Sequence, residues 1–245
     1  MQESNVVITG AGRDLGRALA ILFAERGDRV FLSARSQSNA ERTRDELLAR
    51  GHTEVYAFPC DLSKPKTIRD FAAMVSERAP CVDILVNNAA GWLEGSNLSD
   101  AQDDAIVSAV TSTVAGTVLV VKHFLPMLLA SERPDIINMI SAAGLTGVYK
   151  SESAHSAYYA AKSGQSGFVH DLSRRLRPKN VRVISLYPPD FDNLDPLSPS
   201  WRSASRAATD RLTSISVTDC IMFAINQPRD CFINAFHFSP EALSD

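Results

Sequence analysis

The sequence predicts an α/β fold, in which one doubly wound parallel sheet of about seven strands carries helices on both faces. Short β-branched runs alternate with longer helical patterns along all 245 residues, and the runs are almost continuously apolar, as in parallel strands buried on both faces. The alternation persists along the whole chain, so we expect a single domain over residues 1–245. The expected strands are 5–9, 29–33, 54–58, 83–87, 135–140, 181–187 and 231–236.

The helical patterns fall between these strands in regular order. The strand at 5–9 leads through glycines into a helical pattern at 15–27, and another pattern at 43–51 precedes the third strand. Gly27 and Gly51 are placed as C-terminal stops, because glycine readily takes the left-handed conformation that ends a helix.

The proline-rich segment 188–205 interrupts this order between the sixth strand and the last helix. Long loops in compact domains are usually functional or disordered. We therefore expect a substrate loop region at 188–212.

The composition is that of an ordinary globular protein, with 45% hydrophobic and 22% charged residues. A net charge of −3 argues against a general nucleic-acid binder, which needs a basic surplus. The most apolar stretch, 118–130, is interrupted by Lys122, His123 and Pro126, and is shorter than the roughly 20 apolar residues that cross a bilayer. With no signal-peptide pattern at the N-terminus, we expect a soluble, cytoplasmic protein without membrane or nucleic-acid partners.

The four cysteines are far apart and form no CxxC pair. Neither a metal site nor a disulfide framework is indicated. Isolated thiols suit the reducing cytosol.

Three glycines follow the first expected strand, in the stretch VITGAGRDLG. Gly10, Gly12 and Gly16 would allow a tight turn, close approach of the backbone to a pyrophosphate, and close packing of helix against strand. The helix that follows would point its free N–H groups and positive dipole end at the anion. This arrangement predicts a dinucleotide-binding (Rossmann) loop; the alternative is a plain glycine turn.

Asp14 places a carboxylate inside this loop. Aspartate is a favoured helix N-cap, so we expect its carboxylate to bond the free N–H groups of the helix and not to face the phosphates. Aspartate also tolerates unusual backbone angles, and Arg13 beside it supplies a compensating charge. We expect weaker cofactor affinity as the result, not lost binding.

The residue after the second strand discriminates between the two nicotinamide dinucleotides. An acidic residue there would bond a ribose 2′-hydroxyl and favour NAD, whereas an arginine would accommodate the 2′-phosphate of NADP. The stretch VFLSARSQS carries Arg35 and no acid, and Arg13 lies in the neighbouring loop. NADP is therefore favoured over NAD; the alternative is that Arg35 is a solvated surface residue.

Tyr158 and Lys162 are four residues apart in the stretch SAYYAAKSGQSG, which places them on one helix face. A free phenol, with a pKa of about 10, is a poor acid–base group at neutral pH. A neighbouring ammonium favours the phenolate and lowers that pKa. Tyr159 has Ser163 at the same offset and lacks such a partner. The pair is a candidate acid–base group; the alternative is a surface Tyr–Lys contact.

Four motifs stand in order, each after an expected strand: TGAGRDLG at 9–16, NNAA at 87–90, SAAG at 141–144 and YYAAK at 158–162. Together they resemble the classical short-chain dehydrogenase/reductase family, whose members carry T-G-x-x-x-G-x-G, N-N-A-G, a serine after the fifth strand and Y-x-x-x-K. The resemblance covers residues 4–236.

The resemblance implies a role for each matching residue. Ser141 would orient the carbonyl or hydroxyl of the substrate, Tyr158 would pass the proton, and Lys162 would lower the phenol pKa and hold the nicotinamide ribose. Asp61 would contact the adenine, with the Leu62 backbone beside it. The implied catalytic residues are Ser141, Tyr158, Lys162 and Thr113, and the implied cofactor-binding residues are Gly10, Gly12, Arg13, Leu15, Gly16, Arg35, Asp61, Leu62, Asn88, Ala89, Tyr158, Lys162, Pro188 and Phe191.

The sequence also departs from the family pattern. Asp14 and Ala90 replace glycines of the first two motifs, and Pro189 replaces the glycine of a loop that grips the nicotinamide amide. Thr113 stands where the family has an asparagine that holds a proton-relaying water; its shorter reach predicts slower relay. The longer loop at 148–157 is expected to lie over the site.

Other candidate residues near the site carry open alternatives. His155 would be a second acid–base group or a substrate contact, although a lone histidine in a polar loop is more often solvated. Trp92 and Trp201 would wall the pocket, or else lie in the core or on the surface.

Two hypotheses follow. The first is an NADP-dependent oxidoreductase acting on a small-molecule carbonyl or secondary alcohol, working as a homodimer or homotetramer paired through helices around 100–130 and 155–177. The second, motivated by the departures, is an NADP(H)-binding sensor or regulatory protein of the same fold with weak or no turnover. The intact serine–tyrosine–lysine set favours the enzyme.

Overall fold

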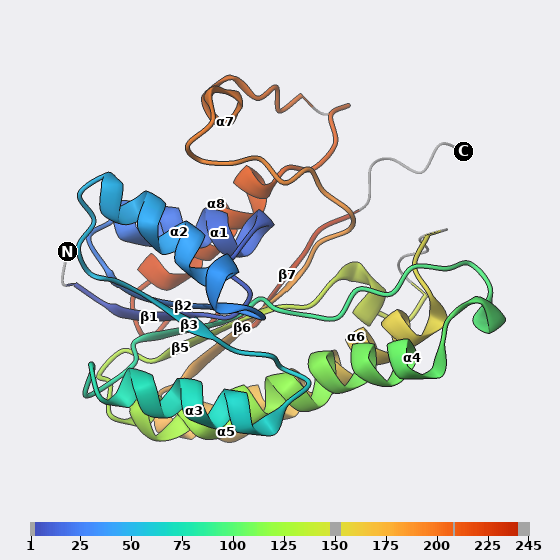
Figure 1. Ribbon diagram of the computed structural model, residues 1–245, viewed down its shortest axis with the longest axis horizontal. Coiled ribbons are helices and arrows are strands. Elements are labelled where there is room, and N and C mark those ends of the chain that lie inside the picture. Colours follow the sequence, from blue (N-terminus) through green and yellow to red (C-terminus); the bar gives the residue numbers. More distant parts are fainter. Residues whose placement is uncertain (1–2, 148–152, 208, 240–245) are drawn as a thin grey trace.

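The computed structural model describes residues 3–147, 153–207 and 209–239. Seven strands form one sheet in the order β3-β2-β1-β4-β5-β6-β7, and every neighbouring pair is parallel. Helices cover both faces of this sheet (Figure 1). The predicted doubly wound α/β fold is therefore confirmed.

The strands are short apolar runs because alternate residues enter two different cores. In β1 (Asn5–Ile8), Val6 and Ile8 lie in one buried cluster and Val7 lies in the other. A strand buried on both faces has no position for a solvent-facing polar residue. The remaining strands are β2 (Arg29–Ala34), β3 (Val55–Pro59), β4 (Ile84–Asn87), β5 (Asp135–Met139), β6 (Arg182–Tyr187) and β7 (Ala235–His237).

Each face of the sheet has its own helical layer. One layer consists of α1 (Asp14–Glu25), α2 (Gln37–Ala49) and α8 (Ser214–Asn226), and the other of α3 (Pro65–Ser76), α4 (Asp103–Val110), α5 (Gly116–Leu129) and α6 (Ser156–Leu176) (Figure 1). Gly27 and Gly51 follow α1 and α2 with φ values of 88° and 90°, so the predicted left-handed stops are confirmed. Shorter elements are α7 (Pro199–Ser203), 3₁₀ turns at Leu98–Asp100, Ala142–Gly144 and Arg177–Lys179, and a π-helix at Thr111–Ala115.

The π-helix joins α4 to α5 into one helical stretch of 27 residues, Asp103–Leu129. This stretch is long and apolar enough to span a membrane, with a mean hydropathy of 1.7 over 18 residues, but buried core helices meet the same criterion. Val120 and Phe124 lie in the core cluster, where α5 packs against α3 and β4. One face of this helix therefore belongs to the interior of the protein.

Six of the seven expected strands lie within one residue of the observed bounds. The seventh was expected at 231–236 and is found at Ala235–His237. The carbonyl of Cys231 accepts a hydrogen bond from the buried guanidinium of Arg182, which also pairs with Asp135, at 2.6 Å. The backbone at Cys231 is thus used to satisfy a buried charge and not to pair with β6.

Candidate active site

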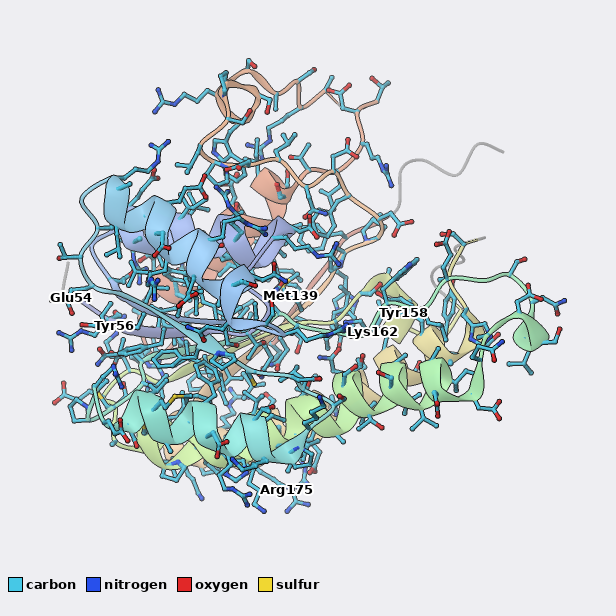
Figure 2. The ribbon with its side chains drawn as sticks, viewed as in Figure 1. Glu54, Tyr56, Met139, Tyr158, Lys162 and Arg175 are labelled. Atoms are coloured by element: carbon cyan, nitrogen blue, oxygen red, sulfur yellow. The ribbon has the colours of Figure 1, made fainter. Side chains whose placement is uncertain are left out.

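A cleft of about 810 Å³ opens where β1, β2, β4, β5 and β6 end. Because β1 lies between β2 and β4, the chain turns in opposite directions on its two sides, and doubly wound sheets bind ligands at this switch point. Tyr158 and Lys162 extend from α6 toward the strand ends near Met139 (Figure 2).

The structure brings almost all of the predicted site residues to this one cleft. Thr113 is the exception and does not line it. The predicted residues that line the cleft are Gly10, Gly12, Arg13, Leu15, Gly16, Arg35, Asp61, Leu62, Asn88, Ala89, Ser141, Tyr158, Lys162, Pro188 and Phe191. Their position is observed; their individual roles stay predictions.

The glycine loop is fastened to the end of β4 by polar contacts. The side-chain amide of Asn88 donates to the carbonyls of Thr9 and Gly10 at 3.1 and 3.2 Å, and the Thr9 hydroxyl accepts from the Asn88 and Ala89 N–H groups. Gly10 has a φ of 70°, and a Cβ on Gly16 would collide with the Gly10 carbonyl and the Asn88 amide. Side chains at these glycines would therefore close the turn that forms the wall of the cleft.

Asp14 has the unusual backbone angles that the sequence predicts, but it is not the N-cap of α1. It replaces a family glycine and has a φ of 50°, the left-handed region that aspartate tolerates. However, the N-cap of α1 is Arg13, and Asp14 is the first helical residue. The Asp14 carboxylate pairs with Arg13 at 3.4 Å. The expected N-cap was therefore wrong, because the helix begins at Asp14 itself and its carboxylate pairs with Arg13; Asp14 lines the cleft.

Basic side chains line the cleft next to the carboxyl end of β2. Arg35 lines it directly, and Arg42 of α2 donates to the Gly12 carbonyl at 2.9 Å. Burial alone would raise the pKa of Asp61, but hydrogen bonds from Ser63 and the charges of Lys64 and Arg35 lower it, so the carboxylate is ionised at neutral pH. An arginine and a carboxylate acceptor thus face the same space.

Ser141 follows β5 in a strained conformation. Its φ and ψ are both 154°, a region populated almost only by glycine, and such strain costs about 1–3 kcal/mol. Its hydroxyl oxygen accepts a hydrogen bond from the Ala143 N–H at 3.1 Å. The Ala142 N–H donates to the Pro188 carbonyl at 2.8 Å. These contacts fix the turn at Ser141, which lines the same cleft as Tyr158.

Lys162 is the most deeply buried charge in the cleft, with 3% of its surface exposed. Its ammonium donates to the Met139 carbonyl at 3.0 Å and to the Gln165 side-chain carbonyl at 3.1 Å. Its Nζ lies 5.8 Å from the centre of the Tyr158 ring. Burial lowers the pKa of this ammonium to about 7, because the charged form loses its hydration.

Thr113 is buried within the π-helix. Its hydroxyl oxygen accepts from the Gly91 N–H at 3.0 Å, directly after the NNAA turn. The Thr113 hydroxyl thus supports the backbone beside the cleft, and its role in holding a relay water stays a prediction.

The aromatic and histidine candidates divide between the cleft and the interior. Trp92 lines the cleft and meets Tyr158 edge-on at 4.8 Å between ring centres, whereas Trp201 lies in α7 and does not line it. His155 is fully buried: its Nδ1 accepts from the Ala157 N–H at 3.1 Å, and its Nε2 lies 3.3 Å from the Leu98 carbonyl. The expectation of a solvated histidine was wrong, because the segment after Trp92 folds over it; it caps α6 instead. Residues 148–152 of the expected longer loop lie outside the described part of the chain.

Sequence reasoning missed several residues of the cleft, which lie in β2, in α2 and in the π-helix and belong to no motif. Their only signal is position after a strand end or polar character close to one. They are Ser33, Asn39, Arg42 and Ser112, whereas Asp190 and Arg211 fall within the predicted substrate loop region 188–212.

Comparison with known proteins agrees with this architecture. A family model described as short chain dehydrogenase matches residues 4–196. The chain belongs to the short-chain dehydrogenase/reductase family and is an oxidoreductase of that family.

Individual relatives are more distant. An uncharacterized oxidoreductase of Staphylococcus aureus is 25% identical over 240 residues, which cover 98% of each chain. Short-chain dehydrogenase/reductase 3 of Homo sapiens is 35% identical over 149 residues, 60% of this chain and 49% of the human protein. A metagenomic short-chain oxidoreductase solved in complex with NADP is 28% identical, covers 97% of each chain and superposes with a TM-score of 0.78. An alcohol dehydrogenase of Thermococcus sibiricus, 22% identical with a TM-score of 0.81, shares the fold.

Proposed function

We propose that the protein transfers a hydride between NADP(H) and a small-molecule carbonyl or secondary alcohol, with Tyr158 as the acid–base group. The observation that carries this proposal is the meeting of Ser141, Tyr158 and the buried Lys162 in the cleft that the glycine loop also forms. Cofactor binding alone would use the ammonium but does not require a serine and a phenol beside it.

The cleft fits a dinucleotide on structural grounds. The glycine turn packs closely against the end of β4, because a Cβ at Gly10 would meet Ala89 and a Cβ at Gly16 would meet the Gly10 carbonyl and the Asn88 amide. The Ser33 hydroxyl lines the cleft and is buried without a hydrogen-bond partner in the described structure. A polar ligand there would satisfy it. Arg35 and Asp61 would hold the adenosine end, and Lys162 the ribose next to the nicotinamide.

When bound, the nicotinamide supplies or accepts the hydride. The chain supplies the rest. In the reducing direction, the Ser141 hydroxyl donates a hydrogen bond to the substrate carbonyl, and the Tyr158 hydroxyl gives its proton to the same oxygen as the alcohol forms. The Lys162 ammonium stabilises the phenolate that remains. Oxidation of an alcohol reverses these proton movements.

The preference for NADP rests on Arg35 and Arg42, which line the end of the cleft beyond β2. A planar guanidinium binds a phosphate strongly and a ribose hydroxyl weakly. Fluorescence titration of NADPH and NADH tests this preference: we expect tighter NADPH binding, reduced at least about tenfold by Arg35→Ala. Exposed Arg50→Ala serves as the matched control. Tighter binding of NADH would overturn the assignment.

Turnover is tested with a panel of aldehydes, ketones and quinones with NADPH, and of secondary alcohols with NADP. We expect at least one member to react, and Ser141→Ala to slow it by about 10²-fold. If no carbonyl or alcohol reacts while NADPH binds, the enzyme proposal fails.

That failure would favour the second candidate, an NADP(H)-binding sensor or regulatory protein. The observation behind this candidate is the Asp14 carboxylate, which lines the cleft with 52% of its side chain exposed. A negative charge at the glycine loop opposes a pyrophosphate.

We further propose a soluble, cytoplasmic homodimer or homotetramer that pairs through the Asp103–Leu129 stretch and α6. Only 39% of the apolar window in that stretch is buried in one chain, and Val107 and Leu129 are exposed on it. Unburied apolar surface of this kind suits a second copy. Light scattering of the purified protein without detergent tests this: a monomer, or a protein that requires detergent, would contradict it.

A further inference from the structure

Gln165 is a fully buried polar residue that no motif accounts for. It lies on α6, three residues after Lys162, and its side-chain carbonyl accepts from the Lys162 ammonium at 3.1 Å. Its amide nitrogen donates to the Thr117 hydroxyl at 3.1 Å, and that hydroxyl donates to the Thr113 carbonyl at 2.7 Å. A continuous chain of hydrogen bonds therefore joins Lys162 to the π-helix.

Each bond in this chain fixes the direction of the next. An ammonium only donates, so it must face the carbonyl oxygen of the Gln165 amide. The Thr117 hydroxyl uses its hydrogen on the Thr113 carbonyl and presents a lone pair to the Gln165 N–H groups. The amide is thus held in one orientation, with its negative end toward Lys162.

The ammonium of Lys162 has three N–H groups. Two are used by the Met139 carbonyl and Gln165, both away from the solvent. The third is left for the cleft that Lys162 lines beside Tyr158. None of the carboxylates described in that cleft, Asp14, Asp61 and Asp190, forms an ion pair with Lys162. The other charged side chains described there are cations: Arg13, Arg35, Arg42 and Arg211.

We propose that Gln165 is a positioning residue that holds the Lys162 ammonium charged and aimed at the cleft. The proposal rests on the proposed function, because the aimed charge matters only if Tyr158 transfers a proton. An amide donates through nitrogen and accepts through oxygen, so it holds the charge without passing protons. Proton exchange is left to the third N–H and the cleft.

The decisive measurement is the titration of Lys162 in the cofactor-free protein, followed by NMR of ¹³C-labelled lysine side chains and assigned with Lys162→Arg. Gln165→Leu removes the acceptor and should reduce the ratio of ammonium to amine at a given pH about tenfold. Gln165→Glu keeps an acceptor oxygen and adds a charge, so it should raise that ratio. A role in packing alone would not shift the two variants in opposite directions.

Turnover supplies a second readout. With NADPH and an accepted carbonyl, Gln165→Leu should lower kcat about tenfold, while its NADPH dissociation constant stays within about threefold of the wild-type value. Gln165→Glu should turn over faster than Gln165→Leu at higher pH and approach the wild-type rate there. Exposed Gln102→Leu is the matched control and should change neither measurement. If the leucine variant does not fold, Gln165→Met replaces it. The glutamate variant still shows whether an added acceptor charge raises the ratio of ammonium to amine at Lys162.

The proposal is overturned if both substitutions leave the Lys162 titration unchanged or move it in the same direction. If the titrations shift as expected but the wild type turns over no substrate, the positioning stands and the proposed enzyme function fails. The two failures are therefore distinguishable.

Discussion

Replacing Lys162 with methionine tests the buried charge on which the proposed chemistry depends. In the unfolded chain this lysine keeps its proton up to about pH 10.5, whereas burial in the folded protein lowers its pKa to about 7. Unfolding therefore takes up a proton between these values, and stability rises with pH in this window. The energetic penalty of the buried ammonium is complete below pH 7 and vanishes above pH 10.5.

The size of the effect follows from the two pKa values. Each pKa unit corresponds to about 1.4 kcal/mol, so the full penalty is about 5 kcal/mol, of which about 2 kcal/mol disappears between pH 7 and pH 9. Methionine does not titrate. The free energy of unfolding of Lys162→Met, relative to wild type, should therefore fall by about 2 kcal/mol between pH 7 and pH 9, or roughly 4–8 °C in Tm.

Thermal unfolding of the cofactor-free proteins at pH 7, 8 and 9 measures this difference. The hydrogen bonds that methionine cannot make to Met139 and Gln165 are lost at every pH, so they shift the curve without changing its slope. Lys66→Met is the matched control, because Lys66 is exposed and pairs with Asp70 at 2.6 Å; its difference should stay flat. A Lys162→Met difference that is equally flat would refute the desolvation argument.

Three further substitutions test the loop and the helix cap. Gly16→Ala should weaken NADPH binding at least about tenfold and destabilise the fold by about 1–3 kcal/mol, because its Cβ meets the Gly10 carbonyl; fluorescence titration and thermal melting that match wild type would show that the loop yields. Asp14→Gly should stabilise the protein by up to about 1 kcal/mol by relieving the positive φ, and should tighten NADPH binding; weaker binding would mean that the carboxylate helps to hold the cofactor. His155→Ala should lower the free energy of unfolding by about 2–4 kcal/mol through loss of the α6 cap and a buried side chain, and urea unfolding with an unchanged midpoint would contradict the capping role.

The framework of the site was predictable because its residues follow strand ends. Once the parallel strands are identified, the carboxyl ends meet at one edge, and motifs at 9–16, 87–90 and 141–144 must converge there. The four-residue spacing of Tyr158 and Lys162 then sets their common face.

What the sequence could not predict depends on contacts between distant segments. His155 sits in a polar stretch that suggests solvation, yet the Leu98 carbonyl, 57 residues away, helps to bury it. Gln165 meets Thr117 across 48 residues, and neither belongs to a motif. The last strand starts late because the Cys231 carbonyl is used by the buried Arg182 charge. Burial of a polar group by a remote partner leaves no local pattern to read.

The most direct test of the account compares single-turnover rates of NADPH oxidation by an accepted carbonyl in wild type, Tyr158→Phe and the neighbouring control Tyr159→Phe. With NADPH saturating, we expect a loss of about 10²–10⁴-fold for Tyr158→Phe and little change for Tyr159→Phe. A Tyr158→Phe rate within a few-fold of wild type would mean that another group transfers the proton.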